Sequence, residues 1–407
     1  MRFKKYLVAL ITTLFSICVI WIINEFLIKT PQENVVKVGF VYISDQATAY
    51  TNNFCSSQRE IENIFGSKIQ TIAKYNIPDT ENEIKNALID LVNQDCKLIF
   101  STSYGYGQFT KEVAQQYPDV QFCQATCDNA NQEPVLPNYH TFMGRIFEGR
   151  YVCGVVAGLK LLELLQAGKI HSGNVEVGYV AAFHYPEVIS GFTAFYLGVQ
   201  SVIPDAKMIV RYTYAWCDFA AEKKCAQQLI DEGCVIIAQH SDTIGPAVAC
   251  EEACIKNKKV VYHVGYNQTM SDVAPTTSLI SCRINWTPYL EQAVRAVISG
   301  KRIESVVKSK LKGNDSVFGF DKDWVEMLGT NRIIVSPEMS PEMSSEIEKL
   351  EKQFSSGKLT VFKGNFIGVN PFDENDVWNL NTPFYENKEQ SAPSFHYILQ
   401  DCIIVRE

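Results

Sequence analysis

The 407-residue sequence predicts an α/β protein of two similar, doubly wound lobes that face each other across a cleft. Two observations support this prediction. Residues 97–120 have the pattern strand, loop and helix and lead into another apolar strand, which is the βαβ unit of a parallel sheet. The same pattern returns far downstream, so a segment of domain size is repeated.

The βαβ unit at residues 97–120 is where the first lobe is expected to bind a ligand. An apolar run typical of a buried strand leads into the turn 101–107, and the helical pattern after the turn ends at Pro118. In open parallel sheets, ligands bind at the loops that leave the C-terminal ends of the strands, so we expect Ser103 and Tyr104 to contact a ligand. The turn lacks the third glycine of a dinucleotide fingerprint.

The repeat extends over several elements. Residues 93–100 align with residues 231–238 at an offset of 138, and residues 36–41 align with residues 175–180 at an offset of 139. Chance similarity between strands does not explain matched elements in one order at nearly one offset. The spacing therefore predicts two lobes, each with its own sheet, and a cleft between two sets of loops.

Two further loops at strand ends supply candidate ligand-binding side chains. One follows the first strand of the first lobe, and the other follows the repeated strand of the second lobe. They contribute Asp45, Tyr50 and Asn53 from residues 43–53, and His240 and Asp242 from residues 239–245.

The remaining elements follow in order along the chain. Apolar periodicity predicts a helix over residues 81–92 with Asp79 as its N-cap, and its counterpart over residues 221–230 with Asp218 as N-cap. A helix over residues 145–165 is rich in glycine and alanine, which indicates close packing against another element.

These elements define the predicted domain boundaries. The segments are 1–30 as a signal or anchor, 36–142 plus 268–308 as lobe one, 143–267 plus 311–370 as lobe two, and 371–407 as a tail without an assigned role. The chain is expected to cross between the lobes near residues 138–144, 265–268 and 311–319.

The N-terminus has the pattern of an export signal. Five residues that include three basic side chains precede an almost continuously apolar run over residues 6–28, which is long enough to span a bilayer as a helix. Because no small-x-small cleavage site follows, we expect an uncleaved membrane anchor, with lipidation at Cys18 as the alternative. In both cases the rest of the chain faces the outside of the cell.

Composition limits the partners and cofactors that the sequence predicts. The net charge is −8 and the pI is about 5.4, so a nucleic-acid partner is not expected. Beyond Cys18 there are twelve cysteines, and disulfides or free thiols both stay open. Cys250 and Cys254 have a spacing that suits a metal, but no third ligand accompanies them, and neither a metal nor a cofactor is predicted.

Five segments together resemble one protein family. The chain is similar to the basic membrane protein family of ABC-transporter substrate-binding proteins, which includes bacterial purine nucleoside receptors. The resemblance covers roughly residues 36–365. It implies a type I periplasmic-binding-protein fold with three crossovers, a small-molecule ligand and an ABC permease as partner. The segments are LIFSTSYGY at 98–106, GRIFEGRY at 144–151, YAWCD at 214–218, AQHSD at 238–242 and NWTPY at 285–289.

The resemblance also implies how a nucleoside is held. In the family, aromatic rings sandwich the base while acidic and amide groups hold the ribose. This chain departs from the family at Asn267, where an Asp is usual, and at residues 126–127, where many members place an Asp. The positions that carry over are Asp45, Tyr50, Ser103, Tyr104, Trp216 and Asn267.

Several alternatives stay open at the level of sequence. His240 and Asp242 resemble a catalytic pair, and a nucleoside hydrolase in the same cleft is the alternative to a binding protein. No nucleophile motif accompanies them, and we therefore expect no enzyme activity. A ligand sensor tethered to the membrane is a third possibility. Trp286 suits either stacking on a ligand or packing at a hinge. Arg145, Glu148 and Arg150 have the spacing of a structural ion-pair set.

Overall fold

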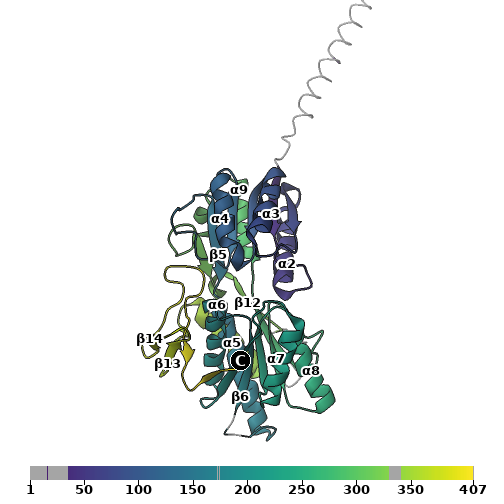
Figure 1. Cartoon of the computed structure of the whole chain (residues 1–407), viewed down its shortest axis with the longest axis vertical. Coiled ribbons are helices and arrows are strands. Elements are labelled where there is room, and N and C mark those ends of the chain that lie inside the picture. Colours follow the sequence, from purple (N-terminus) through teal and green to yellow (C-terminus); the bar gives the residue numbers. More distant parts are fainter. Residues whose placement is uncertain (1–15, 17–34, 172, 174, 330–340, 407) are drawn as a thin grey trace, which may run out of the picture.

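The computed structural model describes residues 16, 35–171, 173, 175–329 and 341–406. Two α/β lobes lie one above the other, and the last part of the chain covers one flank of the lower lobe (Figure 1). The prediction of two lobes with parallel sheets is confirmed.

Lobe one is built on a six-stranded parallel sheet in the order β11-β5-β4-β3-β1-β2. Its helices include α9, whose Tyr289 ring stacks 3.8 Å from Phe142 of the sheet. The strands are β1 (Val36–Val41), β2 (Ile69–Lys74), β3 (Cys96–Ser101), β4 (Gln121–Ala125), β5 (Tyr139–Gly144) and β11 (Asp315–Phe318), and the helices are α2 (Ala49–Phe65), α3 (Glu81–Asn93), α4 (Gly107–Gln116), α9 (Thr287–Ile298) and α10 (Ile303–Val307).

Lobe two has a seven-stranded sheet in the order β12-β10-β9-β8-β6-β7-β16, in which only the β10–β12 pair is antiparallel among the described strands. The strands are β6 (Glu176–Ala181), β7 (Lys207–Tyr212), β8 (Ile236–His240), β9 (Tyr262–Tyr266), β10 (Ser278–Ile284), β12 (Val325–Leu328) and β16 (Ile403–Arg406). The helices are α5 (Ile146–Gln166), α6 (Pro186–Gln200), α7 (Phe219–Asp231), α8 (Gly245–Asn257) and α11 (Pro341–Ser355).

The internal repeat is visible in the strand orders. Strands β4-β3-β1-β2 of lobe one have the same arrangement as β9-β8-β6-β7 of lobe two. The aligned segments fall on β3 and β8 and on β1 and β6. The C-terminal ends of both sheets therefore face each other, as predicted.

The predicted boundaries between the lobes need correction. Residues 139–144 form strand β5 within lobe one, and the first crossover follows at Arg145. The second crossover lies after Ile284 rather than at residues 265–268, because β10 pairs with β9 and β12 of lobe two. Strand β11 returns to lobe one beside β5, so residues 311–318 also belong to lobe one. The chain then enters lobe two before β12.

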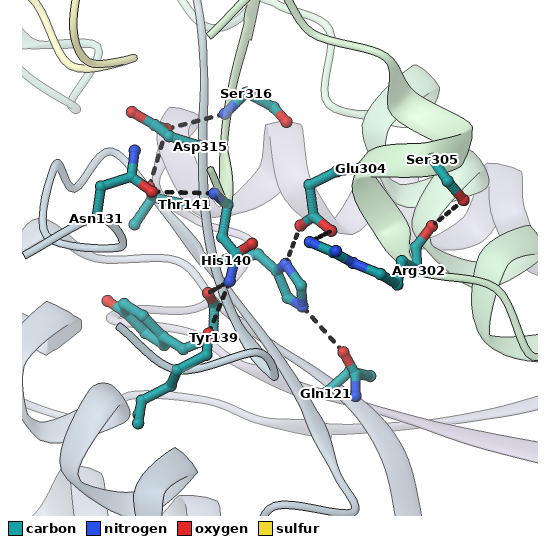
Figure 2. Close-up of polar contacts among 12 residues, drawn as sticks. Gln121, Asn131, Tyr139, His140, Thr141, Arg302, Glu304, Ser305, Asp315 and Ser316 are labelled. Carbon is teal, nitrogen blue, oxygen red and sulfur yellow. Dashed lines mark hydrogen bonds and ion pairs between the residues drawn. The ribbon is translucent and has the colours of Figure 1, made fainter. Parts of the chain in front are cut away.

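A buried histidine ties the returning segment to lobe one. His140 of β5 contacts Glu304 of α10 through Nδ1 and Gln121 of β4 through Nε2, the latter at 2.9 Å (Figure 2). The His140 side chain is almost fully buried. Two strands and one helix from distant parts of the sequence are thereby joined, which explains why the segment after the second crossover folds against lobe one.

The small residues of α5 have the packing role that the sequence indicates. A Cβ atom added at Gly154 would lie 2.0 Å from the carbonyl oxygen of Phe195 in α6. At Gly198 of α6 it would lie 2.2 Å from the carbonyl oxygen of Tyr151. These helices approach each other at distances that only glycine permits at the contact.

The end of the chain, which the sequence left without a role, is structured. We call residues 361–406 the C-terminal extension. It forms a three-stranded antiparallel sheet of β13 (Ile367–Asn370), β14 (Asp373–Asn379) and β15 (Ile398–Leu399), and β16 then joins the lobe-two sheet in parallel with β7. The extension is therefore an integral part of lobe two.

The predicted anchor over residues 6–28 and the alternative at Cys18 lie outside the described residues. Among the described helices, none has the length and apolar character needed to cross a bilayer. All twelve cysteines in the described part of the chain are free thiols.

Candidate functional site

A small cavity of about 60 Å³ lies between the lobes. Its wall is mostly apolar and aromatic. Both lobes contribute side chains that follow the C-terminal ends of parallel strands, as expected for this class of sheet. The lining residues are Ile43, Tyr50, Ser103, Tyr104, Thr126, Glu187, Trp216, His240, Asp242 and Tyr266.

The two lobes touch across this cavity. The backbone N–H of Ala49 in lobe one donates to the carbonyl oxygen of Asp242 in lobe two at 3.1 Å. The rings of Tyr104 and Tyr185 lie 5.7 Å apart across the same junction. The structure therefore represents a closed arrangement of the lobes.

The aromatic rings of the cavity are held in place by contacts behind them. The hydroxyl of Tyr50 donates to the carbonyl oxygen of Thr102, and the ring meets Phe54 edge-on at 5.4 Å. Trp216, in the loop after β7, packs edge-on against Phe183 at 5.3 Å. Rings fixed in this way form a preorganised surface for a flat ligand.

Two carboxylates face the cavity from lobe two. Burial, together with the nearby Glu222 and Glu187 carboxylates, raises the pKa of Asp242 well above its ordinary value. Oδ1 of Asp242 lies 3.5 Å from the side-chain amide nitrogen Nδ2 of Asn267. The second carboxylate belongs to Glu187 at the start of α6. Its oxygen Oε1 lies 3.6 Å from Nε2 of His240.

His240 is a buried, neutral group of this site that lies beside the Glu187 carboxylate. Burial, with a further contribution from the Arg150 cation, lowers the pKa of His240 to about 4. Neither ring nitrogen has a hydrogen-bond partner among the described residues, although the side chain is almost completely buried. Because a buried polar group without a partner is costly, these nitrogens are available for a ligand.

Arg150 lies behind the cavity and supports it. Its guanidinium lies 3.7 Å from the ring centroid of Tyr266 and donates from Nη1 to the carbonyl oxygen of Gln239 at 2.8 Å. The prediction that Arg150 joins an ion-pair set with Arg145 and Glu148 is therefore wrong, because its turn of α5 faces β8 and β9 of the sheet.

The rest of that predicted ion-pair set is confirmed. Arg145 contacts the carboxylate of Glu148 at 2.6 Å and the carboxylate of Asp321 at 2.6 Å. Arg145 and Asp321 lie in the first and third crossovers, so this set joins two of the connections between the lobes.

Six of the ten predicted site residues line the cavity, and four do not. The six are Tyr50, Ser103, Tyr104, Trp216, His240 and Asp242. Asp45 is exposed and accepts from the backbone N–H of Ala47 at 2.9 Å, which makes it a turn residue. Asn267 is buried beside Asp242 rather than at the cavity surface.

The other two predicted residues lie beside the second crossover, Asn53 on α2 and Trp286 directly before α9. Asn53 donates from Nδ2 to the carbonyl oxygen of Ile284 at 2.8 Å. The Trp286 ring stacks on Phe54 at 4.3 Å and is fully buried. Of the two roles left open for Trp286, the structure shows packing at the hinge.

Four residues that line the cavity are not among the predicted site residues: Ile43, Thr126, Glu187 and Tyr266. The repeat contained a signal for one of them. At an offset of 139, Glu187 aligns with Thr48 in the loop after the first strand. Applying the loop rule to the first strand of lobe two would have identified this region.

Comparisons with known proteins identify a family for this chain. The family model described as "ABC transporter substrate-binding protein PnrA-like" matches residues 37–360. A purine-binding protein of Brucella abortus is 29% identical over 336 residues, covering 82% of this chain and 84% of the relative. A putative ABC transporter glucose-binding protein of Haloferax volcanii is 31% identical over 301 residues, covering 74% and 67%.

The fold is shared with solved solute-binding proteins. A structure of an ABC transporter solute-binding protein from Aeropyrum pernix aligns with a TM-score of 0.64 at 16% sequence identity. The alignment covers 84% of this chain and 95% of that chain. This similarity supports the expectation of a periplasmic-binding-protein fold.

Proposed function

This chain belongs to the PnrA-like family of ABC-transporter substrate-binding proteins, and on that premise we propose that the solute bound in its cavity is a purine nucleoside. As the solute-binding component of an ABC transporter, the protein takes a small molecule to a permease. The observation that carries the proposal is a cavity with aromatic rings from both lobes and two carboxylates on one side.

The rings favour a flat ligand. Tyr50 and Tyr104 come from lobe one, and Trp216 and Tyr266 come from lobe two. Aromatic contacts of this kind contribute about 0.5–1.5 kcal/mol beyond the burial of area. A purine base offers two flat π faces to such rings, whereas a sugar offers only C–H groups and hydroxyls.

Charge favours a nucleoside over a nucleotide. Neither lysine nor arginine is among the ten residues that line the cavity. The phosphate groups of a nucleotide would face Glu187 and Asp242 without a cation in contact. Ribose hydroxyls and base N–H groups instead donate to carboxylate oxygens.

The names of the relatives give two candidate ligand classes, a purine and glucose. The aromatic wall of this chain supports the purine. Titration calorimetry with adenosine, guanosine, inosine, the free bases and glucose distinguishes these classes. We expect saturable binding of at least one nucleoside and no heat change with glucose; saturable binding of glucose alone would contradict the proposal.

A substitution in the wall is the matching test of the site. Trp216→Ala removes a cavity ring and is expected to weaken nucleoside binding by at least tenfold, about 1.4 kcal/mol. Ile255→Ala, at an exposed position of α8 outside the cavity lining, is the control and should leave affinity unchanged. Equal affinity of both variants would argue against a ligand at this cavity.

We further propose that the site binds without catalysis. The alternative, a nucleoside hydrolase, draws on the acidic groups around His240. Prolonged incubation with inosine, followed by chromatography for free hypoxanthine, separates the two. Release of base in proportion to protein concentration would establish the hydrolase instead.

The N-terminal segment is proposed to hold the protein at the outer face of the cell membrane, through the apolar run at residues 6–28 or through a lipid on Cys18. Mass analysis of the protein extracted from membranes tests this. An intact N-terminus supports the anchor, an N-terminal lipidated Cys18 supports the alternative, and a soluble, shortened chain contradicts both. Membrane attachment is also compatible with a ligand sensor. Co-purification with a permease rather than a kinase would support a role in transport over a role in sensing.

A further inference from the structure

The C-terminal extension connects the two lobes at a point separate from the three crossovers. The family model ends at residue 360, so the extension lies outside the part of the chain that the family shares. Its strands belong to lobe two, yet residue Ser391 contacts lobe one. Figure 1 shows the extension on the flank of lobe two.

One end of the contact is fixed in lobe two. The carboxylate of Glu386 accepts from Oγ of Ser190 in α6 at 2.9 Å. The same carboxylate accepts from the backbone N–H and the hydroxyl of Ser394, at 2.7 and 2.9 Å, and from the backbone N–H of Phe395 at 2.9 Å. One hydrogen bond therefore joins the segment around Glu386 to helix α6, and the other three fix the conformation of the segment itself.

The other end reaches into lobe one. The backbone N–H of Ser391 donates to Oδ2 of Asp315 at 2.6 Å. Both residues are buried. Asp315 begins strand β11, and its Oδ1 accepts from Thr141 of β5 and from the backbone N–H of Ser316, each at 2.9 Å (Figure 2). The acceptor is thus held firmly by the lobe-one sheet.

The same serine contacts the loop that lines the ligand cavity. The hydroxyl of Ser391 donates to the carbonyl oxygen of Cys127 at 3.4 Å. Cys127 follows Thr126, and its thiol donates to the carbonyl oxygen of Tyr104 at 3.2 Å. Thr126 and Tyr104 both line the cavity. Ser391 therefore does not line the cavity and is joined to its lining residue Tyr104 through Cys127.

We propose that the C-terminal extension is a fourth connection between the lobes, in which Ser391 positions the Thr126–Cys127 loop and resists opening of the cleft. Opening would have to separate an amide donor from a buried carboxylate, and such bonds are stronger than bonds between neutral groups. Burial raises the pKa of Asp315 to about 6, so the acceptor is ionised at pH 7.5. Ligand would then leave more slowly than from two lobes joined by crossovers alone.

The first test compares Ser391→Pro with Ser391→Ala at pH 7.5. Ser391→Pro removes the N–H that reaches Asp315 in lobe one. Ser391→Ala keeps that N–H and removes only the hydroxyl that reaches Cys127, and it is the matched control. Small-angle scattering without ligand should give a larger radius of gyration for Ser391→Pro than for the control. Equal radii in two folded variants would overturn the proposal.

The second arm measures ligand release, and it rests on the proposed nucleoside function. Stopped-flow dissociation of the nucleoside that binds in calorimetry should be about 10- to 100-fold faster from Ser391→Pro than from the control. An unchanged dissociation rate would contradict the proposed resistance to opening. If no nucleoside binds, the proposed function is contradicted. The scattering measurement without ligand still tests whether the C-terminal extension resists opening of the cleft.

Hydrogen exchange of the unaltered protein covers the case in which a proline variant does not fold. The amide of Ser391 should exchange slowly without ligand, at rates near those of strand β11, and more slowly after ligand is added. Exchange of this amide at the rate of an unstructured loop in both states would overturn the proposal.

Discussion

At the scale of single residues, His240 links the binding site to stability. Its pKa is lowered to about 4 by burial, from an ordinary value near 6.5. The stability that follows from this shift is present above pH 6.5 and is lost as the pH falls toward 4, because the unfolded state binds the proton first. The lowered pKa of His240 therefore makes the folded protein less stable at acidic pH.

A variant isolates this contribution. Between pH 7 and pH 5 the free energy of unfolding of the unaltered protein should fall by about 2 kcal/mol more than that of His240→Gln, which has no titrating group at this position. Urea denaturation at both pH values gives the comparison. Equal losses in the two proteins would show that His240 titrates normally in the folded state.

Trp286 is the residue for which the structure decides between two roles. Its ring is fully buried against Phe54 and does not line the cavity. Trp286→Ala should lower the free energy of unfolding by about 3–5 kcal/mol, while nucleosides and free bases keep their order of affinity. Chemical denaturation and calorimetry provide these numbers. A reversed ligand order at unchanged stability would restore the stacking role.

Residue-level prediction located side chains that line the cavity where a loop follows a strand, and it misplaced a side chain where the chain turns back on itself. Tyr50, Ser103 and Trp216 were found because parallel strands direct the loops at their C-terminal ends into the cleft. Asp45 lies in such a loop as well, but its carboxylate accepts from a backbone N–H two residues away. That choice depends on local turn geometry, which strand periodicity does not contain.

At the scale of elements, the contact between α5 and α6 is close enough to require glycine at its centre. Gly154→Ala would place a methyl group 2.0 Å from the backbone oxygen of Phe195, and a backbone atom cannot rotate away. We expect a loss of about 3 kcal/mol in the free energy of unfolding. Gly357→Ala is the control, because only its positive φ of 66° opposes a side chain, at a cost of about 1–2 kcal/mol. A smaller loss at Gly154 would contradict the packing argument.

Elements within each lobe were predictable, whereas the path between the lobes was not. Apolar runs and helical periodicity identified β1, β3, β8 and α5. The sequence around Gly265 predicts a crossover, yet the chain crosses between the lobes only after Ile284. Whether a strand pairs in its own sheet or returns to the other lobe depends on contacts between distant residues, such as those of His140 with Glu304.

At the scale of the whole molecule, the repeat is what made the fold predictable. Two lobes with matching strand order bring two sets of loops together, and the cavity forms where they meet. The C-terminal extension has no counterpart in the repeat, and its mixed polar sequence gave no signal of a sheet. Its place was set by partners in both lobes, Ser190 and Asp315.

We propose that this two-lobed protein selects a purine nucleoside from a mixture of small molecules. The most direct measurement is to incubate the protein with an equimolar mixture of nucleosides, free purines, nucleotides, hexoses and amino acids. After gel filtration, the retained compound is identified by mass spectrometry. We predict that a purine nucleoside is retained in a ratio near one per chain. Retention of a hexose, an amino acid or a nucleotide in its place would contradict the account.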